Sequence, residues 1–145
     1  MKVAKLLPWA IASLALVGFT SQGRPVEILP EADECAACAM AVQDMKVAAE
    51  ALFKNGDVKK FDDIGCMASY LSRKKVGDAQ LKALFVHDLS SGRWLPLEQA
   101  TLVKSKFPTP MRYGVIAFER PEALRRLDPK YQGKVVTWAS VLKGS

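Results

Sequence analysis

The chain has 145 residues, of which 50% are hydrophobic and 25% are charged, so it is not wholly disordered and can form one compact domain. Its formal charge is +6 at pH 7. The basic residues are spread along the chain, however, and no aromatic stacking motif accompanies them, which argues against a nucleic-acid partner. The charge is therefore assigned to a solvated surface.

The first segment, residues 1–23, has the layout of a signal peptide: two lysines, an apolar run over residues 6–19, and a short polar stretch. The run is shorter than the ~20 residues of a typical transmembrane helix and contains Pro8. We expect export to the bacterial periplasm or cell envelope, with an uncleaved N-terminal membrane anchor as the alternative to cleavage. Residues 24–34 are acidic, contain proline and show no periodicity, so they predict a linker.

The first half of the mature chain predicts a β-hairpin followed by a helix. The three elements are residues 47–53, residues 58–61 and residues 64–73. The first alternates in the manner of a strand, and Asn55-Gly56-Asp57 predicts the turn to the second. Asp62 or Asp63 can cap the helix, whose apolar residues recur at helical spacing.

The second half predicts several short strands and one helix. The strands are residues 81–87, 94–97, 101–103, 113–118 and 134–138, and the helix is residues 122–127 after Pro121. In both halves an apolar strand runs into a short helix, which hints at duplication. We therefore predict an α+β fold with small, mainly antiparallel sheets over residues 35–142, in two similar halves of about 35–78 and 79–142.

Three cysteines all follow the signal segment, and an odd number in an oxidising compartment leaves at least one thiol without an intramolecular partner. Two of them form the motif Cys35-Ala36-Ala37-Cys38-Ala39-Met40. On a regular helix Met40 would point about 160° away from Cys38, so a site that uses all three sulfurs requires a loop. Thiolate and thioether together favour copper(I), because both ligands are soft.

Other chemistries compete for the same cysteines. Cys35 and Cys38 can form an exchanging redox pair or a structural disulfide, and three cysteines with His87 can form a zinc site. Against redox exchange, the motif follows a linker rather than lying between a strand and a helix. The single histidine leaves no nucleophile, base and orienting group in a set, so we do not expect an enzyme.

Further soft donors lie downstream. Met111 follows Pro-Thr-Pro and precedes a strand, so we expect it on a loop. Among these downstream donors it is the strongest candidate for a metal ligand. Cys66 lies near a helix start, where a small buried hydrophobe is the simpler interpretation. His87 ends a strand, where a structural hydrogen bond is the commoner role. Asp62 and Asp63 are explained by helix capping.

Taken together, these motifs resemble the NosL family, accessory lipoproteins of nitrous-oxide reductase assembly. The resembling blocks are residues 35–40, residues 61–67 with Tyr70-Leu71, residues 86–88 with 92–94, residues 110–114 with 117–118, and residues 133–138. The likeness covers about residues 33–142. The combination is much more specific than any one motif.

The resemblance implies a copper(I) chaperone of the cell envelope that delivers metal to a copper enzyme such as nitrous-oxide reductase. Carried over by position, its metal ligands are Cys35, Cys38, Met40 and Met111, while a role for Cys66 stays open. The family's lipidated cysteine after the signal peptide is missing from residues 20–23. We therefore expect a free periplasmic protein or an N-terminal membrane tether in place of a lipid anchor.

Overall fold

The computed structural model describes residues 23–144, so most of the predicted signal segment lies outside the described residues. The strands are β1 (Ala49–Phe53), β2 (Val58–Phe61), β3 (Leu81–His87), β4 (Trp94–Pro96), β5 (Thr101–Lys104), β6 (Val115–Phe118) and β7 (Lys134–Val136). The helices are α1 (Ile64–Arg73) and α2 (Trp138–Lys143), with 3-10 turns at Leu97–Gln99, Pro121–Arg126 and Pro129–Tyr131. Within residues 23–144, no helix is long and apolar enough to cross a membrane.

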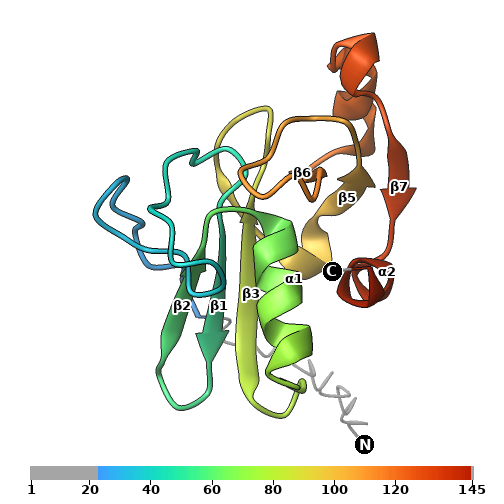
Figure 1. Ribbon diagram of the computed structural model, residues 1–145. Helices are drawn as coiled ribbons and strands as arrows, with labels where there is room; N and C mark the ends of the chain where they lie inside the picture. Colours follow the sequence, from blue (N-terminus) through green and yellow to red (C-terminus); the bar gives the residue numbers. More distant parts are fainter. Residues whose placement is uncertain (1–22, 145) are drawn as a thin grey trace, which may run out of the picture.

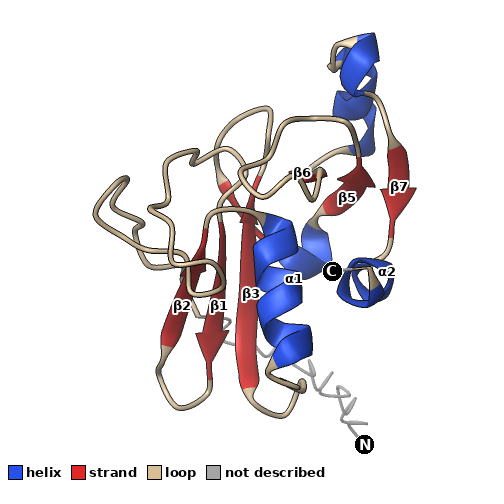
Figure 2. Cartoon of the chain, viewed as in Figure 1, coloured by secondary structure: helices blue, strands red, loops and turns tan. Residues whose placement is uncertain are grey.

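The strands form two antiparallel sheets, in the orders β2-β1-β3-β4 and β6-β5-β7. Helix α1 lies in front of the first sheet, and α2 lies beside α1 and below β7 (Figures 1 and 2). The predicted α+β class with small antiparallel sheets is confirmed. Because β3 and β4 pair into the first sheet, the sheets divide the chain between Pro96 and Thr101, whereas the predicted halves meet after residue 78.

The β1–β2 hairpin and α1 have the predicted local causes. Gly56 supplies a positive φ of 92° in the turn, and the Asn55 side chain accepts a hydrogen bond from the Asp57 amide. Asp63, with extended backbone, is the N-cap of α1, and its carboxylate accepts from the Cys66 amide at 2.6 Å. The apolar face of α1 is buried against the first sheet in the main core.

Several element ends differ from the predictions because tertiary packing decides them. Val47 lies in a turn and packs with the second sheet's core instead of starting β1. Strand β6 starts at Val115, since the preceding Tyr113 lies against α1. The predicted helix at 122–127 is a 3-10 turn, and the last strand ends at Val136 because Thr137 caps α2.

The segment predicted as a linker is attached to the domain. The Glu50 carboxylate, which is fully buried on β1, accepts hydrogen bonds from the Val26 amide at 3.0 and 3.1 Å. The Lys60 ammonium contacts the Asp33 carboxylate at 2.6 Å, and Ile28 is part of the core. Gly23, where the described chain begins, lies against Leu52 near the hairpin turn of the first sheet.

Candidate metal centre

The segment that carries the cysteine pair is a tight loop, the geometry that a site using Cys35, Cys38 and Met40 together would require. The Cys35 amide donates to the Met40 carbonyl at 2.8 Å, and Glu34 and Ala41 form an isolated antiparallel bridge. Ala39 has a φ of 60°, in the left-handed region, which turns the chain back on itself. Cys35 and Met40 therefore face each other across the neck of the loop.

Two contacts hold this loop over the end of the first sheet and α1. The Ala36 amide donates to the Lys60 carbonyl on β2 at 2.9 Å. The Arg73 guanidinium, from the last turn of α1, donates to the Ala37 carbonyl at 3.3 Å. The loop is thereby brought next to Asp62, which follows β2, and to Cys66 in the first turn of α1.

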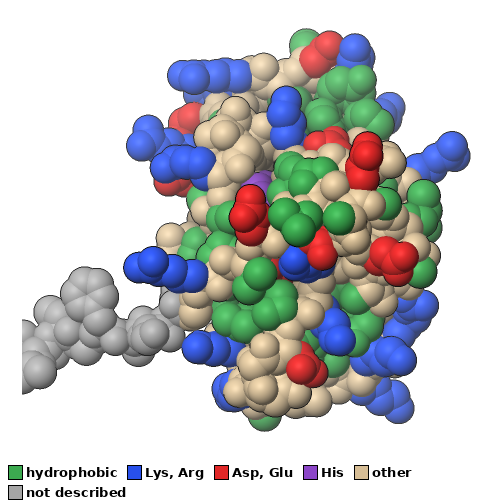
Figure 3. Space-filling view, turned by 90° about the vertical axis from the view of Figure 1, so that its left-hand side faces the viewer, with side chains coloured by type: hydrophobic (Ala, Val, Ile, Leu, Met, Phe, Trp, Pro, Cys, Tyr) green, Lys and Arg blue, Asp and Glu red, His purple; other side chains and the backbone are tan. Residues whose placement is uncertain are grey.

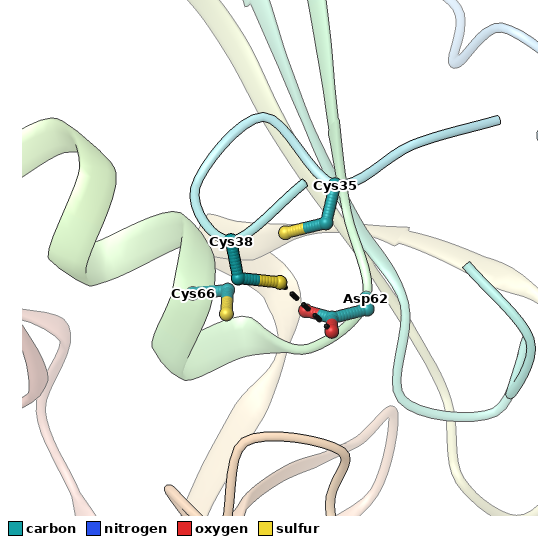
Figure 4. Close-up of side chains that lie close together, drawn as sticks. All are labelled: Cys35, Cys38, Asp62 and Cys66. Carbon is teal, nitrogen blue, oxygen red and sulfur yellow. Dashed lines mark hydrogen bonds between the residues drawn. The ribbon is translucent and has the colours of Figure 1, made fainter. Parts of the chain in front are cut away.

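Four side chains converge at this point (Figure 4). The sulfurs of Cys35, Cys38 and Cys66 and a carboxylate oxygen of Asp62 all lie within 4.8 Å of one another. Metal–thiolate bonds of about 2.3 Å place the ligands of one ion roughly 4 Å apart, so a small contraction would let this group hold a single ion. Cys38 is partly exposed and the other three are buried, so the site is open on the Cys38 side.

The thiols differ in their acidity. The neighbouring Cys66 thiol and nearby backbone amides stabilise the Cys35 thiolate, which lowers the pKa of Cys35 to about 6 despite its burial. Burial raises the pKa of Cys38 to about 11. The neighbouring Cys35 thiolate and burial raise the pKa of Cys66. One thiolate is thus available at neutral pH.

The Asp62 side chain supports a cation at this position. Its Oδ2 accepts a hydrogen bond from the Cys38 thiol at 3.4 Å. Its Oδ1 is buried and has no hydrogen-bond partner among residues 23–144. A buried carboxylate oxygen without a partner is costly unless a cation or a proton compensates it. The donor chemistry therefore fits a metal ion.

Of the four predicted ligands, the two cysteines lie in the cluster and the two methionines are exposed. Cys35 and Cys38 meet in the cluster. Met40 lies at the neck of the loop and is 54% exposed, and Met111 is 40% exposed. The Met111 amide donates to the Asp63 carboxylate at 3.1 Å, which places this methionine beside the first turn of α1.

Sequence reasoning left Cys66 open and assigned Asp62 to capping only. The sequence did contain a signal for both residues. Asp62 and Cys66 lie on either side of the capping Asp63, so the end of the strand and the start of the helix bring them close together. His87 is not in the cluster. Its Nδ1 donates to the Ala48 carbonyl at 3.1 Å, and the centroids of its ring and the Trp94 ring lie 3.7 Å apart. These contacts agree with the structural role predicted for His87.

Fold and site together define a small α+β protein with a thiol-rich candidate metal centre. A solved structure described as the copper chaperone NosL from Shewanella denitrificans has the same fold, with a TM-score of 0.70 and 19% sequence identity over 84% of this chain and 98% of that one. A comparison with curated proteins found no match.

The NosL family model matches residues 25–144, and the chain belongs to the NosL family. The resemblance seen in the sequence is thereby confirmed, together with its implication of a non-enzymatic role. The family match also includes most of the segment predicted as a linker, which agrees with the attachment of Val26 and Asp33 to the first sheet.

Proposed function

We propose that this protein carries copper(I) in the bacterial cell envelope and hands it to a copper enzyme, of which nitrous-oxide reductase is the leading candidate. Cys35 and Cys38 supply thiolates, and Met40 and Met111 supply thioethers. The observation that carries the proposal is the convergence of three thiols at the Cys35–Cys38 loop in a member of the NosL family. The similar structure from Shewanella denitrificans is described as a copper chaperone.

The donor chemistry favours copper(I) as the cargo. Soft thiolate and thioether sulfurs select copper(I) over the harder divalent ions. Cys35, with a pKa of about 6, is largely ionised at neutral pH and offers a first ligand without proton release. Cys38 must release its proton when the ion binds, since its pKa is about 11. The neighbouring Cys66 thiol helps to keep the Cys35 pKa low.

The exposure of the ligands suits transfer rather than storage. Cys38 is partly exposed, and Met40 and Met111 are 54% and 40% exposed. An incoming ligand of a client can therefore reach the ion while Cys35 still holds it. Figure 3 shows several patches of hydrophobic side chains on one face, with Asp and Glu side chains between them and most Lys and Arg side chains toward its edges.

Thiol-disulfide exchange by Cys35 and Cys38 is the alternative function. Exchange needs an attacking thiolate that is both ionised and accessible. Here the two properties lie on different residues, because Cys35 has the lowered pKa but is 1% exposed, while the more accessible Cys38 has a raised pKa. The geometry therefore favours metal carriage over exchange.

An anaerobic titration with copper(I) against a competing chelator tests the proposal. We expect tight 1:1 binding by the mature protein and a large loss of affinity in the Cys35→Ser/Cys38→Ser variant. Met45→Leu is the matched control, because Met45 packs against the core outside the motif. Wild-type affinity in the double serine variant would contradict the proposal, and turnover of a disulfide substrate without copper would favour exchange.

Delivery and localisation need separate experiments. Copper-loaded protein mixed with metal-free nitrous-oxide reductase should lose its copper to the enzyme, whereas the Cys35→Ser/Cys38→Ser variant should transfer none. Cell fractionation should find the protein in the periplasm or tethered to the membrane by residues 1–23. Recovery in the cytoplasm would contradict the proposed site of action.

A further inference from the structure

One buried carboxylate, that of Asp63, joins two parts of the molecule that carry sulfur ligands. Its Oδ1 accepts from the Cys66 amide at 2.6 Å and caps α1. Its Oδ2 accepts from the Met111 amide at 3.1 Å, 48 residues further along the chain. The side chain is fully buried, so water does not replace either bond. Capping explains the first bond but not the second.

A second contact joins the same two segments. A Cβ built on Gly65 would lie 2.1 Å from the Cβ and Cγ of Tyr113, so the Tyr113 side chain occupies the space that any larger residue would need. Gly65 and Asp63 belong to the start of α1, and Tyr113 follows Met111 by two residues. The first turn of α1 therefore holds the Met111 segment on two sides.

The segment itself is a well-defined turn. The Arg112 amide donates to the Thr109 carbonyl at 2.9 Å, and the Gly114 amide donates to the buried Thr109 hydroxyl at 3.0 Å. Arg112 has a left-handed φ of 60°. With its internal geometry fixed in this way, the position of Met111 relative to the thiols depends on the contacts with Asp63 and Gly65.

We propose that Asp63 is a positioning residue of the copper site, which holds Met111 at the edge of the thiol cluster through its second carboxylate oxygen. This inference rests on the proposed function. The two Asp63 oxygens accept from backbone amides rather than from a thiol. Asp63 acts by fixing the thioether-bearing loop against the helix turn that presents Cys66, so the fourth ligand needs no ordering when copper(I) arrives.

Asp63→Asn separates this role from capping. Asparagine caps helices about as well as aspartate, so its oxygen can stay on the Cys66 amide while its NH2 replaces the acceptor of Met111. We expect the copper(I) dissociation constant to rise by roughly 10-fold or more, as is typical when a residue that orients a metal ligand is lost. Met111→Leu should have a similar effect.

The decisive measurement is the double variant Asp63→Asn/Met111→Leu. If Asp63 acts through Met111, the double variant binds no more weakly than Met111→Leu alone. Multiplied losses, an unchanged affinity of Asp63→Asn, or an unchanged affinity of Met111→Leu would each overturn the inference. Glu50→Gln is the matched control, since it alters a buried carboxylate that ties down Val26 elsewhere and should leave copper affinity unchanged.

A measurement without metal keeps this inference distinguishable from the proposed function. Exchange of the Met111 amide with deuterated solvent should be faster in Asp63→Asn than in wild type and unchanged in Glu50→Gln. Equal exchange in wild type and Asp63→Asn overturns the tether even if copper binds. Failure of the wild type to bind copper(I) would overturn the proposed function instead. Should Asp63→Asn not fold, Asp63→Ser replaces it in the cycle, because serine keeps an oxygen that caps the helix and removes the second acceptor.

Discussion

The unequal acidity of Cys35 and Cys38 predicts a copper(I) affinity whose dependence on pH changes near pH 6. Proton and copper(I) compete for each thiolate, so every thiol that must be deprotonated on binding adds a tenfold loss of affinity per unit of falling pH. Cys35, with a pKa of about 6, is already ionised at pH 7 to 8, whereas Cys38, with a pKa of about 11, is not.

The magnitude follows from counting the protons released. Between pH 7 and 8 only Cys38 releases a proton, so affinity should rise about tenfold per pH unit. Below pH 6 Cys35 is protonated as well, and the slope should approach a hundredfold per unit. Cys35→Ser removes the steeper part, and Cys38→Ser removes the slope between pH 7 and 8. A slope of a hundredfold already at pH 7 to 8 would mean that Cys35 is still protonated there, which refutes its lowered pKa, or that Cys66 also binds as a thiolate.

Chelator competition under anaerobic conditions from pH 5 to 9, corrected for protonation of the chelator, measures these slopes. The reasoning is refuted if affinity is independent of pH between 7 and 8, because Cys38 would then be ionised or would not bind. It is also refuted if the slope does not steepen near pH 6. In that case the neighbouring Cys66 thiol does not lower the pKa of Cys35.

Three further changes test the fold by urea unfolding. Phe61→Ala should lower the free energy of unfolding by about 3–5 kcal/mol, because this fully buried ring packs against the Tyr70 ring with their centroids 5.4 Å apart. A loss below ~1 kcal/mol would contradict that packing. Thr137→Ala should cost about 0.5–1 kcal/mol, because its hydroxyl accepts from the Ser140 amide at 3.2 Å on an exposed surface. Burial raises the pKa of Glu50 above its usual 4.5, so the folded state binds its proton more tightly than the unfolded state. The stability of wild type relative to Glu50→Gln should therefore fall as pH rises above 4.5, and a constant difference would refute this assignment.

The sequence predicted best those elements whose causes are local. Asn55-Gly56-Asp57 specifies a hairpin turn within three residues, and Asp63 specifies a helix start within four. Strand β3 likewise keeps its predicted bounds. Element ends set by distant contacts were predicted less well. Tyr113 leaves its strand to pack on Gly65, a contact that no local pattern indicates.

The candidate site divides in the same way. Cys35 and Cys38 are recognisable because their spacing alone brings both sulfurs to one side of a loop. Asp62 and Cys66 enter the site only because the Ala36 amide and Arg73 hold that loop over the junction of β2 and α1. Two hydrogen bonds between segments distant in sequence therefore decide half of the cluster, and periodicity or spacing does not reveal such bonds.

Gly23 and the thiols lie toward opposite ends of the first sheet. Gly23 lies against Leu52, toward the hairpin turn, whereas the thiols lie at the other end of the same strands, beyond Phe61. At about 3.3 Å per strand residue, the two ends are separated by roughly 10 Å or more. A client can therefore approach the thiols at one end of the sheet without passing Gly23 at the other end.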